Sequence, residues 1–181
     1  MFIETFSGKV INPSNPNVDF IDIEDIAHSL SLQCRFNGHC RTFYSVAEHS
    51  IHTSKYLAQQ NYSAKLCMWG LLHDASEAYL ADIPRPVKTS LKNYLILEKN
   101  LSSLIYKKYT FESPDAKAYK PVDDADNALL MTEAAGLVLS KGKDWGIKAP
   151  STDIKLRYYD WNTAKKEYLK MFYFLSDSIS K

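Results

Sequence analysis

Apolar residues recur at helical spacing along most of the chain. Positions three and four residues apart predict a first helix over about 23–33, and the capping-box pair Ser45 and Glu48 opens a second over about 46–59. The same spacing predicts further helices over about 63–79, over about 88–109, from near Pro121 onward, and after Asp160. This pattern indicates an all-α fold.

Two segments lack the helical pattern. Short β-prone runs around Ser7 and Gly8 predict a small hairpin within an N-terminal appendage of residues 1–21. Residues 141–159 are expected to be irregular, with IKLRYY as a candidate short strand. Because no repeat or linker interrupts the helices, residues 1–181 are predicted to form a single domain. Its core is expected over about 22–140 and its C-terminal helix over about 160–178.

Composition and charge argue against nucleic-acid and membrane partners. The 181 residues carry 22 Lys and Arg against 21 Asp and Glu, so no overall field would attract nucleic acid or an anionic membrane. No apolar run approaches the 18 residues of a membrane span, and the N-terminus lacks the pattern of a signal peptide. Three cysteines at unpatterned spacings favour reduced thiols. We therefore expect a cytoplasmic protein without nucleic-acid or membrane partners.

Residues that commonly bind metal stand beside three apolar helix faces. His49 falls near the inner face of the second helix, His73 and Asp74 follow the apolar run of the third, and Asp126 lies between the apolar Ala125 and Leu129. Each has an ordinary alternative, as a core histidine, a polar helix end or a solvated carboxylate. Imidazole and carboxylate groups together suit a divalent ion, which would supply a charge partner for all four side chains.

These four residues resemble the H…HD…D signature of the HD-domain metal-dependent phosphohydrolases. The resemblance covers about residues 15–140 and includes the specific stretch HDASEAYLADIPRPVK. It is strongest to small single-domain members that act on deoxynucleotides, the bacterial 5′-deoxynucleotidases and phage dATP triphosphohydrolases. The resemblance implies an all-α HD-domain bundle in which the four side chains bind one transition metal, Mn, Co, Zn, Fe or Ni. For a triphosphate substrate it implies Mg²⁺ on the phosphates as well.

The resemblance also implies roles around the metal. Glu77 occupies the position of a carboxylate that handles the nucleophilic water, and Asp82 that of a second acidic residue near the leaving oxygen; which of them is the base stays open. Cationic side chains would bind phosphate, and Phe36 would border the sugar and base. The predicted phosphate ligands are Arg35, Lys88, Arg41 and Arg85.

Some positions depart from the family pattern or stay without a role. Relatives often have a lysine three residues before the last metal ligand, and this chain has Asp123 there. Lys120 or another subunit could replace that lysine. His52 is a rival to His49 as the ligand of the second helix. His28 and His39 are unassigned, and the sequence predicts one metal per site.

The expected activity is hydrolysis of a deoxynucleoside triphosphate similar to dATP, giving deoxynucleoside and triphosphate. A 5′-deoxynucleotidase that releases phosphate from deoxynucleoside monophosphates is the alternative within this class. A non-catalytic nucleotide-binding regulatory HD module is the alternative from another class, although such a module should have lost a ligand or the carboxylate at Glu77. Relatives form dimers or hexamers, so a homo-oligomer is expected, in bacterial cytoplasm or in that of a phage-infected host.

Overall fold

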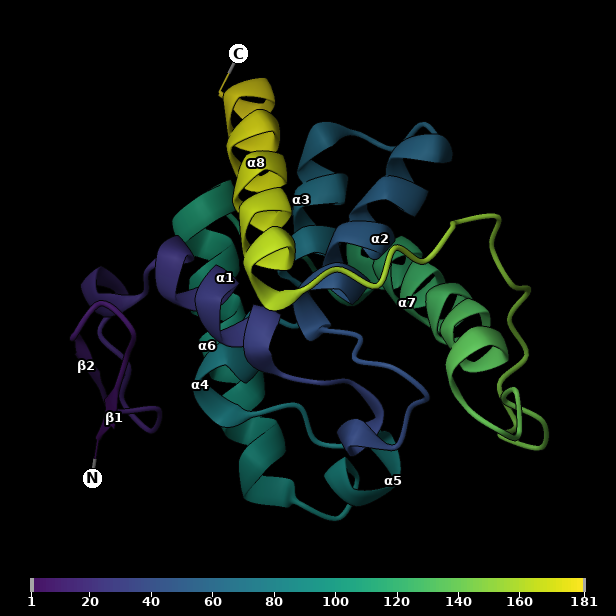
Figure 1. Ribbon diagram of the computed structural model, residues 1–181. Helices are drawn as coiled ribbons and strands as arrows, with labels where there is room; N and C mark the ends of the chain where they lie inside the picture. Colours follow the sequence, from purple (N-terminus) through teal and green to yellow (C-terminus); the bar gives the residue numbers. More distant parts are fainter. Residues whose placement is uncertain (1, 181) are drawn as a thin grey trace.

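The computed structural model describes residues 2–180, a mostly helical fold with one small antiparallel sheet (Figure 1). The sheet pairs β1 (Ile3–Glu4) with β2 (Val10–Ile11). Short 3₁₀ turns, η1 (Val18–Phe20) and η2 (Phe36–Gly38), lie on either side of the first helix. The α-helices are α1 (Ile23–Leu32), α2 (Val46–Gln59), α3 (Ala64–Leu72), α4 (Glu77–Leu80), α5 (Arg85–Lys88), α6 (Lys92–Thr110), α7 (Ala116–Leu137) and α8 (Trp161–Ile179). The predicted all-α class and N-terminal hairpin are confirmed over these residues.

Helix α2 lies at the centre of the fold. It packs against α1, α3, α7 and α8, while α8 also crosses α1 and α3 in front of them (Figure 1, yellow). Every side chain from Val46 to Ser54 is buried, including polar ones. One apolar cluster continues from Ile11 of the hairpin to Leu175 of α8. The polar face of α2 is therefore enclosed by other helices and must find its partners inside the protein.

Polar residues begin several of the helices. The side chains of Asp22, Ser45, Ser63, Asp115 and Asp160 each accept a hydrogen bond from a backbone N–H in the first helical turn. Those N–H groups have no partner within a helix, so each cap stabilises its helix start by about 1 kcal/mol.

The predicted capping box on α2 is only half formed. Ser45 Oγ accepts from the Glu48 N–H at 3.1 Å, but the Glu48 carboxylate turns away from Ser45. It accepts instead from the backbone N–H groups of Arg157, Tyr158 and Tyr159, at 2.7 to 2.9 Å. The candidate strand IKLRYY is therefore wrong: no strand forms there, and the N–H groups of its last three residues bond to a buried carboxylate rather than to another strand. The predicted irregularity of the surrounding segment is confirmed.

The predicted third helix is interrupted. Helix α3 ends at Leu72 and α4 begins at Glu77, so the continuous helix over 63–79 is wrong. Between them the backbone tightens to i,i+3 hydrogen bonds, with Ala75 N–H on Leu72 O at 3.0 Å and Glu77 N–H on Asp74 O at 2.9 Å. The break lies at the predicted metal ligands and changes the direction in which their side chains point.

Two further helix boundaries differ from the prediction. The helix expected over 88–109 is α6, which begins at Lys92, because a turn at Thr89–Leu91 separates it from the short helix α5. Helix α7 begins at Ala116 rather than near Pro121, because Asp115 caps its first turn and accepts from the Ala118 N–H at 2.8 Å. Pro121 therefore lies inside the helix, where it cannot donate to the Lys117 carbonyl.

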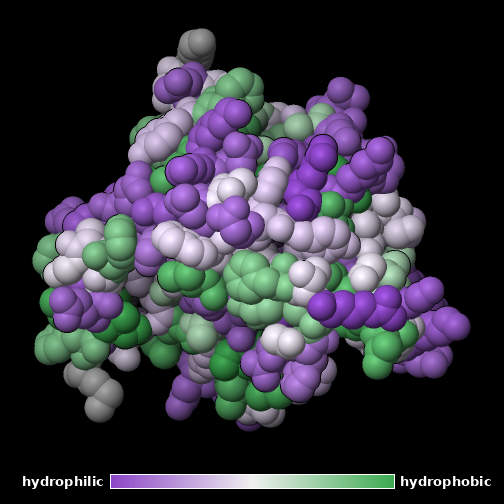
Figure 2. All heavy atoms as spheres, in the orientation of Figure 1, coloured by the Kyte–Doolittle hydropathy of each residue, from purple (hydrophilic) through white to green (hydrophobic). Residues whose placement is uncertain are grey.

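The hairpin is fastened to α1 through a buried carboxylate. Asp25 accepts from the Ser7 N–H at 2.7 Å and from the Ser7 hydroxyl at 2.8 Å. The hairpin exposes apolar side chains, among them Phe2, Phe6 and Val10. Hydrophobic surface is visible over this part of the molecule at the lower left of Figure 2. Within residues 2–180, no helix is both long and apolar enough to cross a bilayer.

Candidate metal centre

The four predicted ligands converge on one place from three parts of the chain. His49 comes from α2, His73 and Asp74 from the turn after α3, and Asp126 from α7. His49 Nε2 lies 3.1 Å from His73 Nε2 and 3.0 Å from Asp126 Oδ1, and His73 Nε2 lies 3.1 Å from Asp74 Oδ2. Within the same group of four, His49 Nε2 lies 3.7 Å from Asp74 Oδ2, and His73 Nε2 lies 3.9 Å from Asp126 Oδ1.

The spacing of these atoms fits the donor set of a single ion. Donor atoms about 2.1 Å from one ion lie about 3.0 Å apart at right angles and about 3.4 Å apart in a tetrahedron. His49, His73 and Asp74 form the compact group that could hold a metal ion, and Asp126 stands beside it, closest to His49. Two imidazoles with two carboxylates are donors that a divalent transition metal accepts.

The histidines present their Nε2 atoms to this centre because their Nδ1 atoms are used elsewhere. His73 Nδ1 donates to the Gly70 carbonyl at 2.8 Å, one turn earlier on α3. His49 Nδ1 donates to the Glu133 carboxylate at 2.6 Å. Both rings thus keep a proton on Nδ1, so loss of the proton from Nε2 would leave a lone pair there for a cation.

Electrostatics at the centre favour ionised groups. Burial lowers the pKa of His73, but the adjacent Asp74 and Asp126 carboxylates outweigh burial and raise it to about 9. Burial acts in the opposite direction on Asp74, yet His73 and the other nearby cations hold the pKa of that carboxyl well below its usual range. Protons on the imidazoles therefore supply the positive charge that the carboxylates need, and a metal must displace them to bind.

A cavity of about 800 Å³ opens beside the centre. Asp74 and Asp126 form part of its wall, together with apolar side chains that include Phe36, Leu130 and Trp145. The two predicted catalytic carboxylates, Glu77 and Asp82, also line it. The cavity is therefore bordered by metal-type ligands and acidic groups on one side and by apolar surface on the other.

Glu77 and Asp82 occupy different surroundings within the cavity wall. Glu77 is buried; its Oε1 accepts from Lys88 at 3.0 Å, and its Oε2 has no hydrogen-bond partner. Burial, reinforced by the Asp74 charge, raises the pKa of Glu77 well above its usual value. Burial also raises the pKa of Asp82, against the opposing effect of Arg35. Both carboxyls can therefore hold a proton at a higher pH than exposed ones do.

Three of the four predicted phosphate ligands line the cavity, and each is paired with a carboxylate. Arg35 NH1 lies 3.7 Å from Asp74, Arg85 NH2 lies 3.1 Å from Asp126, and Lys88 Nζ lies 2.7 Å from Glu98. These charges are close enough to reach an anion bound in the cavity. Its approach would have to exchange some of these pairs for contacts with phosphate.

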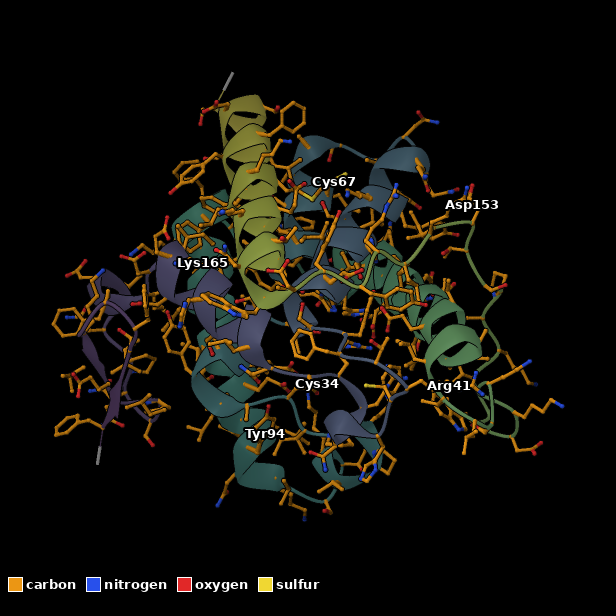
Figure 3. All side chains as sticks on the ribbon, viewed as in Figure 1. Cys34, Arg41, Cys67, Tyr94, Asp153 and Lys165 are labelled. Atoms are coloured by element: carbon orange, nitrogen blue, oxygen red, sulfur yellow. The ribbon has the colours of Figure 1, made fainter. Side chains whose placement is uncertain are left out.

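The fourth, Arg41, does not line the cavity. Arg41 is exposed and follows η2, and its backbone N–H donates to the Leu137 carbonyl at 2.9 Å. Figure 3 labels Arg41 beside the C-terminal end of α7. The predicted contact of Arg41 with substrate phosphate finds no support in this position.

The departure from the HD-domain pattern, at Asp123, and its possible replacement, Lys120, both lie apart from the cavity. Asp123 is exposed, and Lys120 pairs with Asp124 on the outer face of α7. Neither Asp123 nor Lys120 lines the cavity, so Lys120 does not take the place of the missing lysine. His52, the rival to His49, has its Nδ1 2.9 Å from the Tyr44 hydroxyl and lies outside the donor group.

The remaining histidines lie away from the donor group. His39 is exposed and lines the cavity, and His28 stacks on Phe6 of the hairpin with ring centroids 3.8 Å apart.

Sequence reasoning missed Glu133, which contacts one predicted metal ligand, His49, and one predicted phosphate ligand, Arg35. It lies on α7 seven residues after Asp126, two turns along the same helix face. A buried glutamate is rare without partners, and its spacing from Asp126 was the available signal. Trp145 and Ile147, which line the apolar part of the cavity, were also missed because the segment that carries them has no periodic pattern.

The fold and the site together define a helical protein with a buried His and Asp group that could hold a metal ion beside a cavity. No family model matches the chain. It is 41% identical over 146 residues to the uncharacterized protein YfdR of Escherichia coli (strain K12), which covers 81% of this chain and 78% of YfdR. It is 32% identical over 139 residues to the uncharacterized protein RCAP_rcc00048 of Rhodobacter capsulatus, covering 72% and 71%. The chain belongs to the family of these two proteins.

Proposed function

We propose that this protein is an HD-domain phosphohydrolase that cleaves deoxynucleoside triphosphates, releasing deoxynucleoside and triphosphate. The observation that carries the proposal is the convergence of His49, His73, Asp74 and Asp126, with donor atoms 3.0 to 3.9 Å apart. The two aspartates of this group form part of the wall of a cavity that is also lined by cations. This arrangement accompanies the resemblance of the chain to that class of enzyme.

In this proposal the four side chains hold one divalent ion of Mn, Co, Fe, Ni or Zn. When bound, the ion would supply Lewis acidity, making water more acidic and withdrawing charge from the phosphoryl oxygens. Mg²⁺ would accompany the phosphates of a triphosphate.

The protein's own groups supply orientation and proton transfer. Arg35, Arg85 and Lys88 bind the phosphates, while Phe36 borders the sugar and base. We assign proton transfer from the attacking water to Glu77 and protonation of the leaving oxygen to Asp82, since both carboxyls line the cavity together with Asp74 and Asp126. Attack at the α-phosphorus then breaks its bond to the 5′ oxygen.

A 5′-deoxynucleotidase acting on monophosphates is the second candidate. Asp123 stands where relatives often have a lysine and lies close enough to Asp126 for their charges to interact. An extra negative charge there disfavours a long polyphosphate, and a monophosphate would avoid it.

Product analysis tests the two candidates. Purified protein would be incubated with deoxynucleoside mono-, di- and triphosphates and with ribonucleotides, each with Mn²⁺ or Co²⁺, and the products separated by chromatography. Free deoxynucleoside with triphosphate is the expected result. Orthophosphate from monophosphates alone would replace the first candidate by the second, and no hydrolysis of any nucleotide would favour a non-catalytic nucleotide-binding module.

A matched pair of variants on α7 assigns the activity to the metal centre. D126N removes a charged donor and should lower kcat/KM at least 100-fold. D124N changes an exposed carboxylate that pairs with Lys120 and should retain activity within about twofold. Equal activity of the two variants would remove the metal centre from the mechanism.

A further inference from the structure

Glu133 is a carboxylate without solvent exposure that receives three side-chain donors. His49 Nδ1 lies 2.6 Å and the Tyr44 hydroxyl 2.9 Å from Oε1, while Arg35 Nε lies 3.1 Å from Oε2. An ionised carboxylate accepts hydrogen bonds and never donates them, so in all three contacts the partner is the donor. One side chain on α7 thereby connects a group of the metal centre with a group of the phosphate subsite.

Each contact sets the direction of its partner. The bond to Glu133 places the proton of His49 on Nδ1, so Nε2 points its lone pair toward Asp126 and His73. The bond from Arg35 uses Nε and leaves the two terminal nitrogens directed elsewhere, NH1 toward Asp74 at 3.7 Å. The Arg35 side chain is only 11% exposed, so Glu133 has little competition from water for that bond.

We propose that Glu133 is a positioning residue that holds both His49 for the metal and Arg35 for a phosphate oxygen. The proposal rests on the proposed function for the identity of the phosphate ligand. The orientation of His49 can be measured without any turnover. A carboxylate that supports a ligating imidazole typically changes metal affinity or activity 10–100-fold when it is removed.

The E133Q variant tests this arrangement with almost no change in shape. An amide offers one acceptor oxygen and one NH₂ donor, so it cannot accept from both His49 and Arg35 at their present sites. The NH₂ group would face either the His49 Nδ1–H or the Arg35 guanidinium. Both of these groups are donors, so the hydrogen bond to that partner would be lost. We expect Mn²⁺ affinity, measured by the EPR signal of free Mn²⁺, to fall 10–100-fold, or phosphate affinity to fall by that factor with Mn²⁺ affinity kept.

Phosphate affinity would be measured with inorganic phosphate by ³¹P relaxation on Mn²⁺-saturated protein. Two variants serve as controls: E98Q alters another carboxylate that pairs with a cavity cation, and Y44F removes one donor to Glu133 but keeps the carboxylate. Both should bind Mn²⁺ within about threefold of wild type. A folded E133Q protein with unchanged affinity for both Mn²⁺ and phosphate would overturn the proposal.

A spectroscopic measurement on the wild type covers the case in which E133Q does not fold. In ¹⁵N-histidine NMR of Zn²⁺-loaded protein, His49 should show metal at Nε2 and a protected Nδ1–H shifted downfield by its short hydrogen bond. Metal at Nδ1 would overturn the inference. Failure of wild-type protein to bind any metal would instead reject the proposed function, so the two failures can be told apart.

Discussion

At the scale of single residues, His52 shows how burial fixes a protonation state. The Tyr44 hydroxyl donates its proton to Glu133, so its oxygen can only accept from His52 Nδ1, 2.9 Å away. Burial lowers the pKa of His52 to about 4, and the nearby Glu133 charge only partly opposes it. His52 is therefore neutral in the folded protein over the range in which an exposed histidine becomes charged.

This shift predicts a loss of stability in mild acid. The folded pKa of His52, about 4, lies below the value of about 6.5 in an unfolded chain, so the unfolded state binds more protons between these values. Stability should fall as pH decreases through this window, by about 2 kcal/mol from pH 7 to pH 5 for this residue. Urea unfolding at both pH values should show a smaller pH dependence in H52N than in wild type. The exposed His39 gives the control H39N, and equal pH dependence of H52N and wild type would contradict the argument.

The residues of the candidate site differ in how far the sequence revealed them. The sequence predicted that His49, His73, Asp74 and Asp126 share one site, and the structure brings their side chains together. The role of Glu133 depends on which face of α7 packs against α2. The sequence pattern alone does not show which face that is. Arg41 was predicted as one of four cations near the site in the sequence, but it follows η2 and does not line the cavity.

At the scale of elements, periodicity located the helices and missed their breaks. The apolar pattern from Ala64 to Tyr79 is continuous because both α3 and α4 pack on the core, although the backbone between them departs from α-helical hydrogen bonding. Pro121 was taken as a helix start, but Asp115 supplies a stronger local cap six residues earlier. Apolar spacing reports which faces are buried, and it does not report a change of backbone geometry between them.

The packing of α3 on α2 predicts the effect of a small substitution. A Cβ at Gly70 would lie 2.4 Å from Leu57 Cδ1, a fully buried side chain, so G70A should destabilise the protein by about 1–3 kcal/mol despite the better helix propensity of alanine. At Gly136, exposed near the end of α7, the nearest atom is the Tyr158 hydroxyl at 3.3 Å. G136A should therefore be neutral or stabilising. Denaturant unfolding would measure both, and equal effects would contradict close helix contact at Gly70.

At the scale of the whole molecule, the metal centre joins α2, α7 and the turn after α3. An ion bound only by the folded state should stabilise the entire protein. After treatment with chelator, addition of Mn²⁺ to 100 times its dissociation constant should stabilise by about 2.7 kcal/mol and raise Tm by about 5–10 °C. Calorimetry should show no increase for D74N and a wild-type increase for D124N. An increase in D74N equal to that of wild type would place the ion elsewhere.

The large sequence separation between Glu133 and its partners has a consequence for biosynthesis. It joins residues that precede it by 84 and 98 positions, His49 and Arg35. Until translation reaches α7, the nascent chain carries His49, His73 and Asp74 but neither Asp126 nor Glu133. If the group binds a cation as proposed, its full set of four donors is complete only after Asp126 has been translated, and a chain that stops before α7 would offer the three donors His49, His73 and Asp74 alone.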